Sequence, residues 1–574
     1  MNNYIFASTF SEEIINSYNA SFNKKIIVEK AYIDQKHLNS KNLIIEDLSY
    51  DNQNFIESYN YIKANINEFK DLILNEIQIH YKNININLIS SSVEFWLLHY
   101  ISIIKIRYEK LIYIKNKYKN ISLPRVQYNK IEFLDTSDFI NQVELEESIN
   151  CIIFEKIGEI LGIDFFEIKN KKNFSTEKKE ISFFFYIKKK LFRFILFNFK
   201  LNISFDVYTV KKKITKIFEF FNSKKIYLSS EVLKIENSKS HSNFYGNNLN
   251  DKKNNIEKND LNYILLKLLP FFLPKIFYNN LDFLIKDLEK IEKNIISLNS
   301  SIAISSSDEF RFLAEICKSK MKNVITYQHG GLYTLQKYNL SDEFEKKHTN
   351  FLDWKNKNSF NIFFKSFFFL KNINYSSNKK ILFFSAIKTI NMVKYESELI
   401  NFKSNKEKIV DVVNLYKNLS STLKTIFEIR CQKHNYNWNY KGMFLQNLRE
   451  PFYGSFENKK SVQNAIATSR ILIFDTISTI FFEALVAKIP FFLILKNDNF
   501  FFKNDIKKLI NELMVQKILF KNTEECAHFI NDNYNQITDF WRSPGVIKVI
   551  EKLNNKFFYI DININNNNLD KNYN

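Results

Sequence analysis

The chain has 574 residues, 45% of them hydrophobic, and carries 82 lysine and arginine residues against 62 aspartate and glutamate residues, a net charge of +20. Single hydrophobic cores stop growing near about 250–300 residues, which argues against a single domain. Four widely separated cysteines without a CxxC pair argue against a disulfide framework and a structural zinc site. The positive charge does not by itself indicate a nucleic-acid partner, because A- and T-rich codons explain the abundance of Lys, Asn, Ile and Phe more simply.

The sequence gives little indication of a signal peptide or of a membrane-spanning segment. The N-terminus MNNYIFASTFSEE has no basic region and no long apolar core, so we expect no signal peptide. The most apolar stretch, YILLKLLPFFLPKIFY, is interrupted by Lys267, Pro270, Pro274 and Lys275. The sequence therefore predicts a cytoplasmic protein that could rest on the inner membrane. The Phe- and Lys-rich residues 183–200 could touch lipid, but a buried element with solvated lysines is the favoured interpretation.

The first third of the chain is expected to be largely helical. NNYIFAST predicts a short strand, and apolar residues then recur at helical spacing through residues 54–118. Ser91 or Ser92 is a plausible N-cap for the second helix of this region. Residues 237–259 are polar and predict a flexible insertion, and the Asn-rich tail from Asp561 is expected to be disordered.

A strand–helix–strand unit is predicted around residues 296–331. SIAISSS is expected as a strand, DEFRFLAEICKSK as a helix capped by Ser307, and NVITYQ as a second strand that ends at His329. The carboxyl end of a strand in a parallel sheet is where ligands bind. Gly330 and Gly331 are paired here in a chain with only 8 glycines, so we interpret them as permitting close ligand approach or positive φ. The alternative is a plain tight turn capped by His329.

A second series of strands starts at residues 379–386. TIFEIRCQ predicts another strand, which contains Arg430 and leads to a loop with His434. Further on, RILIF predicts a buried strand, IFFEALVAK a helix and IPFFLIL the next strand.

The turn between RILIF and its helix is the clearest candidate phosphate site. Thr476, Ser478 and Thr479 would lie at the helix N-terminus, beside free backbone N–H groups and the positive end of the helix dipole. Asp475 ends the strand, and Glu483 lies about one turn into the helix. The alternative is that these Ser and Thr side chains merely cap the helix.

These elements predict an α/β protein with two Rossmann-like domains and a helical N-terminal portion. We expect residues 1–375 to form an acceptor-side α/β domain and residues 376–548 to form a nucleotide-donor domain. Residues 549–574 would contain the end of the C-terminal helix and the disordered tail. Two such halves with facing sites resemble the GT-B class of glycosyltransferases, in which the C-terminal half binds most of the nucleotide-sugar donor.

The resemblance can be narrowed by an ordered set of short motifs. The D-[ST]-x-S-[ST] helix resembles that of teichoic-acid glycerophosphotransferases and capsule sialyl- and Kdo-transferases, in which it holds donor phosphate. The whole set resembles a bacterial family of transferases from surface-polysaccharide loci. Its members in this chain are Trp96 with Arg107-Tyr108, His329-Gly330-Gly331, Glu343-Phe344-Glu345, Arg430 with Trp438, Asp475 to Thr479, and Trp541-Arg542-Ser543. The chain departs from the family at Leu332-Tyr333-Thr334, where a further glycine is usual, and at Asn437.

The resemblance implies roles for these residues in transfer. We expect His329 to act as the base or as a donor to a phosphate or carboxylate. Glu343 and Glu345 would not share a face of a helix, whereas in a loop or strand either could be the base or a nucleophile; the alternative is solvated surface. Arg430 could pair with phosphate, and His434 could do the same or be structural. No D-x-D suited to a metal-bound nucleotide is found, so we expect no metal and no cofactor besides the nucleotide-sugar substrate.

The leading hypothesis is a glycosyltransferase that moves a sugar from a nucleotide-sugar donor to a cell-surface polysaccharide such as capsule or O-antigen, or to a lipid-linked acceptor; a CMP-activated nonulosonate or Kdo sugar is one candidate donor. One alternative is a CDP-alditol phosphotransferase of the teichoic-acid type, which needs the same phosphate site. Others are a non-enzymatic nucleic-acid-binding protein and a scaffold. The lysines are spread along the chain without a nucleic-acid-binding motif, so we expect no specific nucleic acid partner.

Overall fold

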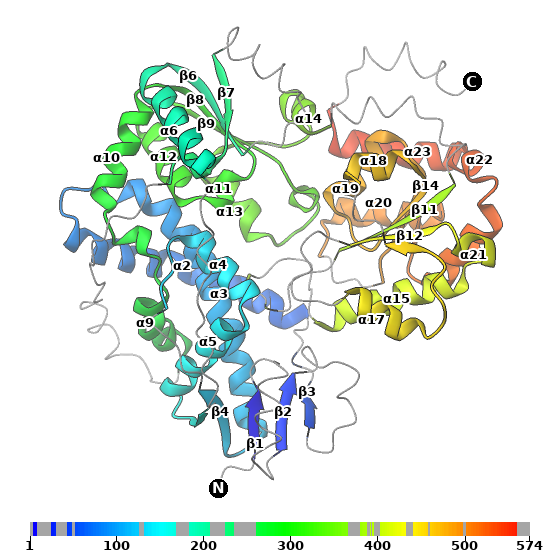
Figure 1. Ribbon diagram of the computed structural model, residues 1–574, viewed down its shortest axis with the longest axis horizontal. Coiled ribbons are helices and arrows are strands. Elements are labelled where there is room, and N and C mark those ends of the chain that lie inside the picture. The colour runs from blue at the N-terminus through cyan, green and yellow to red at the C-terminus, as the bar shows by residue number, and fades with distance from the viewer. Residues whose placement is uncertain are drawn as a thin grey trace.

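The computed structural model describes residues 4–7, 25–29, 43–46, 48, 52–125, 131–167, 183–206, 224–234, 260–364, 379–386, 391, 393–394, 402–431, 440–456, 460–496 and 501–559. Three parallel sheets with flanking helices make up this part of the chain (Figure 1). The α/β class predicted from the sequence is therefore confirmed. The expected insertion at 237–259, the tail from Asp561 and the loop with His434 lie outside the described residues.

The N-terminal portion combines two long helices with a sheet of short strands. Its helices are α2 (Asn52–His80) and α3 (Asn87–Lys117), which occupy the region predicted to be helical. Its parallel strands, in the order β3-β2-β1-β4-β5, are β1 (Tyr4–Ala7), β2 (Lys25–Glu29), β3 (Leu43–Glu46), β4 (Ile121–Arg125) and β5 (Asp164–Glu167). The predicted cap at Ser91 or Ser92 is wrong. The buried stripe already begins at Leu88 and Ile89, so the helix starts earlier and encloses both serines.

The middle sheet contains the first predicted strand–helix–strand unit. Its strands, in the order β10-β9-β8-β6-β7, are β6 (Leu201–Phe205), β7 (Lys225–Leu228), β8 (Ile295–Ser300), β9 (Asn323–Tyr327) and β10 (Asn350–Leu352). Helix α12 (Asp308–Ser319) joins β8 to β9, and the Ser307 side chain caps it by accepting from the Phe310 N–H, as predicted. The strand expected at SIAISSS is misplaced. The strand ends at Ser300, and Ser305 and Ser306 donate to the Ile302 carbonyl in a short helical turn.

The C-terminal sheet has the strand order 3-2-1-4-5-6 of doubly wound nucleotide-binding domains. Its strands are β11 (Lys380–Ser385), β12 (Phe427–Cys431), β13 (Ser455–Phe456), β14 (Ser469–Phe474), β15 (Phe491–Ile494) and β16 (Leu519–Phe520). Phe384 in β11 is in register with Arg430 in β12 and Phe474 in β14, so these three strands end at the same level. The strand order reverses between β11 and β14, and helix α19 (Thr479–Ala487) follows β14.

The other helices cover the faces of the sheets. In the N-terminal part they are α4 (Thr136–Leu145), α5 (Glu147–Ile160), α6 (Phe183–Asn198), α9 (Leu261–Phe272), α10 (Leu281–Glu292), α11 (Ala303–Ser306), α13 (Leu340–His348) and α14 (Lys357–Phe364). In the C-terminal part they are α15 (Phe402–Asn418), α16 (Ser421–Lys424), α17 (Tyr440–Leu448), α18 (Val462–Ala467), α20 (Asn504–Val515), α21 (Thr523–Asn533), α22 (Ile537–Trp541) and α23 (Pro544–Phe557). Single 3-10 turns are η3 (Ser230–Val232), η4 (Lys275–Phe277) and η5 (Gly331–Thr334).

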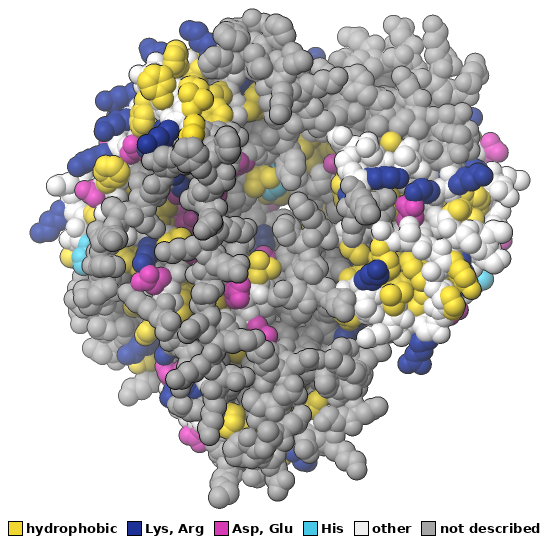
Figure 2. Space-filling model, in the orientation of Figure 1, with side chains coloured by type: hydrophobic (Ala, Val, Ile, Leu, Met, Phe, Trp, Pro, Cys, Tyr) yellow, Lys and Arg dark blue, Asp and Glu magenta, His cyan; other side chains and the backbone are white. Residues whose placement is uncertain are grey.

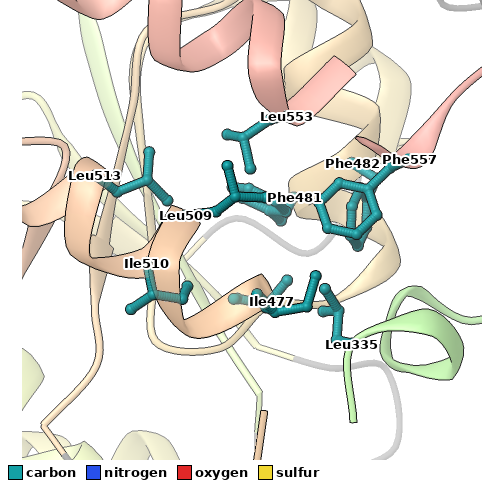
Figure 3. A pocket seen from close by; sticks show the side chains of 10 residues that line it. Leu335, Ile477, Phe481, Phe482, Leu509, Ile510, Leu513, Leu553 and Phe557 are labelled. Carbon is teal, nitrogen blue, oxygen red and sulfur yellow. The ribbon is translucent and has the colours of Figure 1, made fainter. Parts of the chain in front are cut away.

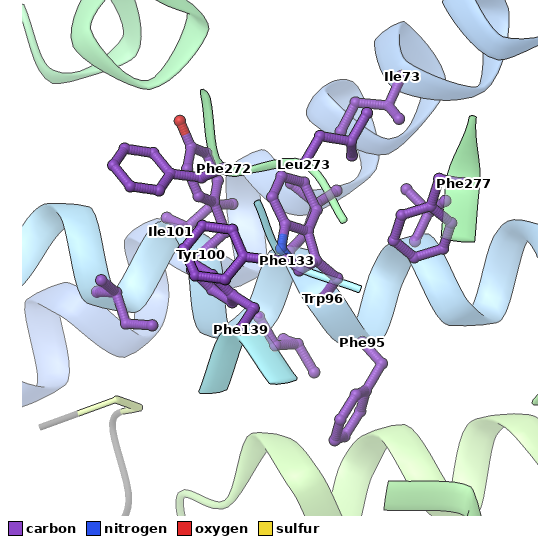
Figure 4. Packing of buried hydrophobic residues seen from close by; sticks show 14 of the residues in the cluster. Ile73, Phe95, Trp96, Tyr100, Ile101, Phe133, Phe139, Phe272, Leu273 and Phe277 are labelled. Carbon is purple, nitrogen blue, oxygen red and sulfur yellow. The ribbon is translucent and has the colours of Figure 1, made fainter. Parts of the chain in front are cut away.

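Helix α3 is buried among aromatic side chains. Trp96 stacks on Tyr100 with ring centroids 4.6 Å apart, and Phe139 and Phe277 pack around the same indole (Figure 4). Arg107 of the same helix is buried and donates to the Asn150 side chain at 2.5 Å. The family motif that joins Trp96 to Arg107 therefore has a structural role in the described core.

A buried ion pair connects this helix to the middle sheet. Arg311 and Asp308 both have fully buried side chains, and a guanidinium nitrogen lies 2.6 Å from a carboxylate oxygen. Arg311 also donates to Ser92 at 3.0 Å and to the Ile304 carbonyl at 2.7 Å, while Asp308 accepts from the backbone and hydroxyl of Thr136. A buried pair is stable only when its remaining hydrogen bonds are made, as they are here.

Removing one member of this pair should destabilise the chain strongly. Arg311→Met leaves the Asp308 carboxylate buried without its counter-charge, which costs about 3–5 kcal/mol of unfolding free energy. The control Lys552→Met removes an exposed ion pair with Glu512 and should cost about 1 kcal/mol or less. Urea unfolding followed by circular dichroism measures both variants. Equal losses in the two would show that the buried network does not hold the helices together.

Candidate active site

Trp354 anchors the loop after β9 by a side-chain hydrogen bond to its backbone. The indole N–H donates to the Gln328 carbonyl at 2.9 Å, and the Gln328 side chain donates to the Gly330 carbonyl at 2.9 Å. Trp354 is buried and packs edge-on against Phe482 of α19, with ring centroids 5.1 Å apart. The loop that carries His329 is therefore fixed against both the middle sheet and the helix that follows β14.

Neither glycine of this loop has positive φ: Gly330 has an extended backbone, with φ −120° and ψ 145°. Their role is steric. A Cβ at Gly330 would lie 2.9 Å from the Tyr333 ring, and one at Gly331 would lie 2.6 Å from the Phe482 ring and 3.1 Å from the Ser478 carbonyl carbon. The interpretation that the glycines permit positive φ is wrong, because the loop needs them to pack closely against its neighbours.

A hydrogen-bonded chain joins His329 to Glu345 through Tyr333. The Tyr333 hydroxyl lies 3.0 Å from Nε2 of His329 and donates to a Glu345 carboxylate oxygen at 2.7 Å. When the Tyr333 hydroxyl donates to Glu345, its oxygen is available to accept from Nε2 of His329, and this tautomer leaves the ring lone pair on Nδ1. Nδ1 of His329 and Oε2 of Glu345 are buried, and neither has a hydrogen-bond partner of ordinary geometry among the described residues.

Burial shifts both titrating groups away from their charged forms. It lowers the pKa of His329 to about 4; the positive charge of Lys394 adds a smaller decrease, and a hydrogen bond with the Ser301 backbone opposes both. It raises the pKa of Glu345 to about 8, and Asp342 adds to the rise while Tyr333 and Lys394 oppose it. At neutral pH the imidazole is a neutral base, and the carboxyl is largely protonated. Lys394 is thus a cationic group near both side chains.

The two glutamates of the E-x-E motif lie on α13 and point apart. Glu345 is fully buried and faces Tyr333, whereas Glu343 is partly exposed, forms a 2.8 Å ion pair with Lys63 and accepts from the Tyr59 hydroxyl. Residues two apart on a helix do not share a face. The structure therefore brings Glu345, and not Glu343, together with His329.

The first turn of α19 meets the His329 loop directly. The Thr479 hydroxyl donates to the His329 carbonyl at 3.4 Å, and Ser478 is the N-cap residue but makes no side-chain capping bond. The N–H groups of the first helical turn have no partner within the helix. The N–H donors of α19 and the His329 imidazole consequently lie on segments that contact each other.

The remaining residues predicted for the phosphate site differ in burial and in hydrogen-bond partners. Asp475 is buried and accepts from the Ser385 hydroxyl and the Ala386 N–H, so it ties together the strand ends at the reversal point of the sheet. Thr476 is also buried. Burial raises the pKa of Glu483 to about 8, and its Oε2 has no hydrogen-bond partner within the described ranges. Arg430 is the penultimate residue of β12 and donates to the Lys460 carbonyl at 2.9 Å.

The two halves of the site are also joined away from the polar groups. The Lys337 N–H donates to the Phe501 carbonyl at 2.9 Å, and the Lys503 N–H donates to the Leu335 carbonyl at 3.0 Å. An apolar cavity of about 10 Å³ lies between Leu335, α19, α20 and α23 (Figure 3). It is no larger than one water molecule and has no polar lining side chain, so it belongs to the packing and is not a substrate pocket.

Comparison with known proteins gives the family. The LIC12162 family transferase model matches residues 11–569. The chain belongs to this transferase family. No curated protein has a significant match to this transferase. Within the described part of the chain, every helix is too short or too polar to span a membrane, and no group of three or more His, Cys, Asp or Glu side chains is arranged to hold a metal ion.

Solved structures similar to the transferase are distant. A variant of the wall teichoic acid polymerase TagF, soaked with CDPG, is 13% identical over 64% of this chain and 92% of its own, with a TM-score of 0.29. A Listeria monocytogenes protein described as a UDP-N-acetylglucosamine 2-epimerase is 8% identical over 63% of this chain and 100% of its own, with a TM-score of 0.33. At such scores the likeness supports no argument about function.

Two residues near His329 were missed by the sequence analysis. Tyr333 belongs to Leu332-Tyr333-Thr334, the segment that departs from the resembled family, and it bridges His329 and Glu345. Tyr333 is four residues from His329 and twelve from Glu345. This spacing indicates contact with both residues only when the conformation of the turn and the position of α13 are known. Lys394 lies about sixty residues further along the chain, and no local pattern marks it.

The raised pKa of Glu345 predicts a pH-dependence of stability with a definite sign. Between the ordinary carboxyl value of 4.5 and about 8, the folded chain keeps a proton that the unfolded chain has released. This contribution to stability is fully present below pH 4.5 and is lost as the pH rises through about 8, by up to about 1.4 kcal/mol per pH unit. Glu345→Gln keeps an acceptor for Tyr333 and should remove that slope.

Unfolding free energies measured by urea denaturation across this pH interval check the prediction. The matched control is Glu343→Gln, which changes the exposed carboxylate of the same helix and should follow the wild-type slope. If Glu345→Gln and wild type lose stability in parallel, Glu345 is ionised in the folded chain and the inferred protonation is incorrect.

Proposed function

We propose that this transferase moves a sugar from a nucleotide-sugar donor to a cell-surface polysaccharide or a lipid-linked acceptor. The observation that supports this most is the contact between the His329 loop and the first turn of α19, where the Thr479 hydroxyl donates to the His329 carbonyl at 3.4 Å. A helix N-terminus favours the donor's phosphate, and a neutral imidazole beside it is suited to proton transfer. From the resemblance to capsule transferases we propose a CMP-activated nonulosonate or Kdo donor.

In the proposed reaction, Nδ1 of His329 takes the proton of the acceptor hydroxyl as its oxygen bonds to the anomeric carbon. The bond from that carbon to the donor's phosphate oxygen breaks, and the nucleotide leaves with the electron pair. The N–H groups at the start of α19 and the hydroxyls of Ser478 and Thr479 would stabilise the charge on the leaving phosphate. The cationic Lys394 would add to this stabilisation.

Tyr333 and Glu345 would position and support the base. Once Nδ1 is protonated, the imidazolium is stabilised by the Tyr333 oxygen at Nε2, and Tyr333 is held in turn by its 2.7 Å bond to Glu345. Glu343 is not part of this chain of hydrogen bonds, so we propose a role for it only in the contact of α13 with α2. Arg430, at the end of β12, is proposed to reach the nucleotide from the neighbouring strand.

The proposed division of labour follows the two sheets. Residues 1–375 would hold the acceptor, and residues 376–548 would hold the donor at the reversal point between β11 and β14. Trp354 and α14 pack in the same apolar cluster as α19 and α23, so contacts across this boundary are extensive. A CDP-alditol phosphotransferase would need the same phosphate site. Product analysis separates the two, because sugar transfer adds no phosphorus to the acceptor, whereas alditol phosphotransfer leaves a phosphodiester on it.

Loss of the proposed base should reduce transfer without unfolding the chain. His329→Ala should lower kcat by about 10²–10⁴-fold, since that is the usual contribution of a general base. Tyr333→Phe keeps the imidazole but removes a hydrogen bond to a group that becomes charged, which should cost about tenfold to a hundredfold. Steady-state assays with a panel of nucleotide sugars give these ratios.

The matched control is His528→Ala, which changes a solvent-exposed histidine of α21 and should retain full activity. The acid limb of the kcat/KM profile should follow the lowered pKa of His329 in the wild type, with activity lost as the pH falls towards about 4. Full specific activity in folded His329→Ala would contradict the assignment of the base.

The first turn of α19 should control donor binding. Ser478→Ala combined with Thr479→Ala removes two hydroxyls beside the proposed phosphate, and each lost hydrogen bond to a charged group costs about 1.5–3 kcal/mol, which is roughly tenfold or more in Kd. Calorimetric titration with CMP, CDP and UDP measures the change. Asn522→Ala, which removes the cap of α21, is the control and should lower stability without changing nucleotide affinity. Unchanged affinity in the double variant would place the phosphate elsewhere.

A further inference from the structure

Helix α6 is apolar on the side that faces solvent. Ile187, Leu191 and Phe194 are 49%, 56% and 60% exposed, and their spacing of four and three residues places them in one stripe along the helix. Phe199, just beyond the helix, is 49% exposed, and Ile296 in β8 is 48% exposed. A surface helix of a globular protein normally turns such a stripe towards the core. The interpretation of residues 183–200 as a buried element is therefore wrong for these side chains.

The opposite side of α6 is firmly attached to the protein. Leu196 is fully buried, and Arg193 pairs with Asp287 of α10. Asn294, before β8, donates to the Leu196 carbonyl at 3.2 Å at the end of the helix. Since this face already supplies the packing, the exposed stripe is not needed to hold the helix in place.

The charged side chains of the segment that carries the stripe are all basic. Residues 183–200 contain five basic side chains and no acidic one: Lys188, Lys189, Lys190, Arg193 and Lys200. Lys190 and Lys200 are exposed, as is Lys224 before β7. Hydrophobic side chains with Lys and Arg around them gather at the upper left of the space-filling view, where α6 and strands β6 to β8 lie (Figures 1 and 2).

We propose that the α6 stripe, defined as Ile187, Leu191 and Phe194, docks this transferase on an anionic lipid bilayer. Apolar side chains would enter the boundary between headgroups and acyl chains, and the flanking lysines would lie at the level of the phosphates. A second copy of the chain fits this surface less well, because a symmetric contact would bring the lysines of both copies together. Membrane docking would bring the active site to a lipid-linked acceptor, and only this biological role depends on the proposed function.

Co-sedimentation of the full chain with vesicles tests this surface. One set consists of phosphatidylcholine alone, and the other of equal parts phosphatidylcholine and phosphatidylglycerol. Leu191→Asn combined with Phe194→Asn should lower the partition coefficient on the mixed vesicles by about tenfold or more, since it removes apolar insertion. Lys190→Gln should lower it by about fivefold, the usual effect of one basic side chain near an anionic surface.

Matched controls lie in the C-terminal part. Val515→Asn changes an apolar side chain that is 75% exposed on α20, and Lys507→Gln changes an exposed lysine of the same helix; both should bind as wild type does. Binding that is absent, equal on the two vesicle types, or unchanged in the α6 variants would overturn the proposal. So would self-association of the wild type that the α6 variants abolish, because a second copy would then cover the stripe.

The vesicle-binding result and the transfer-activity result can be distinguished with two kinds of variant. The α6 variants should retain transfer to a soluble acceptor, and His329→Ala should retain vesicle binding. Failure of the base assignment therefore leaves the vesicle result standing, and failure of vesicle binding leaves the transfer assays standing.

Discussion

Gly331 and the first turn of α19 touch at a distance that no side chain at position 331 would permit. A Cβ there would lie 2.6 Å from the Phe482 ring and 3.1 Å from the Ser478 carbonyl carbon. Trp354 packs against the same Phe482, and residues 335–337 pair with residues 501–503 on the other side. The imidazole and the helix N-terminus are thus placed by packing before any ligand arrives, which is the kind of pre-organisation that favours transition-state binding.

Burial around this contact also determines the chemistry that the site can perform. His329 and Glu345 share one hydroxyl as a hydrogen-bond partner, yet their pKa values are shifted in opposite directions, to about 4 and about 8. Both groups are therefore largely neutral at neutral pH, which is the state that the proposed base needs. The transferase family, the doubly wound C-terminal sheet and the proposed base are consistent with one another, and each rests on a different observation.

Much of the fold could be predicted, because buried strands such as RILIF and NVITYQ are continuous apolar runs bounded by polar turns. Most of the N-terminal sheet was missed because its strands have only four or five residues and lie between polar segments. Histidine at a strand end marked one side of the site, and Asp475 to Thr479 marked the other. Tyr333 and Lys394 could not be found, since their roles depend on the path of the chain after β9 and after β11. The sequence alone could not show which of Glu343 and Glu345 lies near His329, because the answer depends on α13 being a helix.

We propose that the loop at His329 and the first turn of α19 form one nucleotide-binding site. Crystal structures of the full chain soaked separately with CMP, CDP and UDP test it most directly. We expect a phosphate within hydrogen-bond distance of the N–H groups or hydroxyls of Ser478 and Thr479, with the His329 imidazole beside it. A nucleotide bound in another part of the chain, with no ligand at this contact, would show that the two segments do not form the nucleotide site.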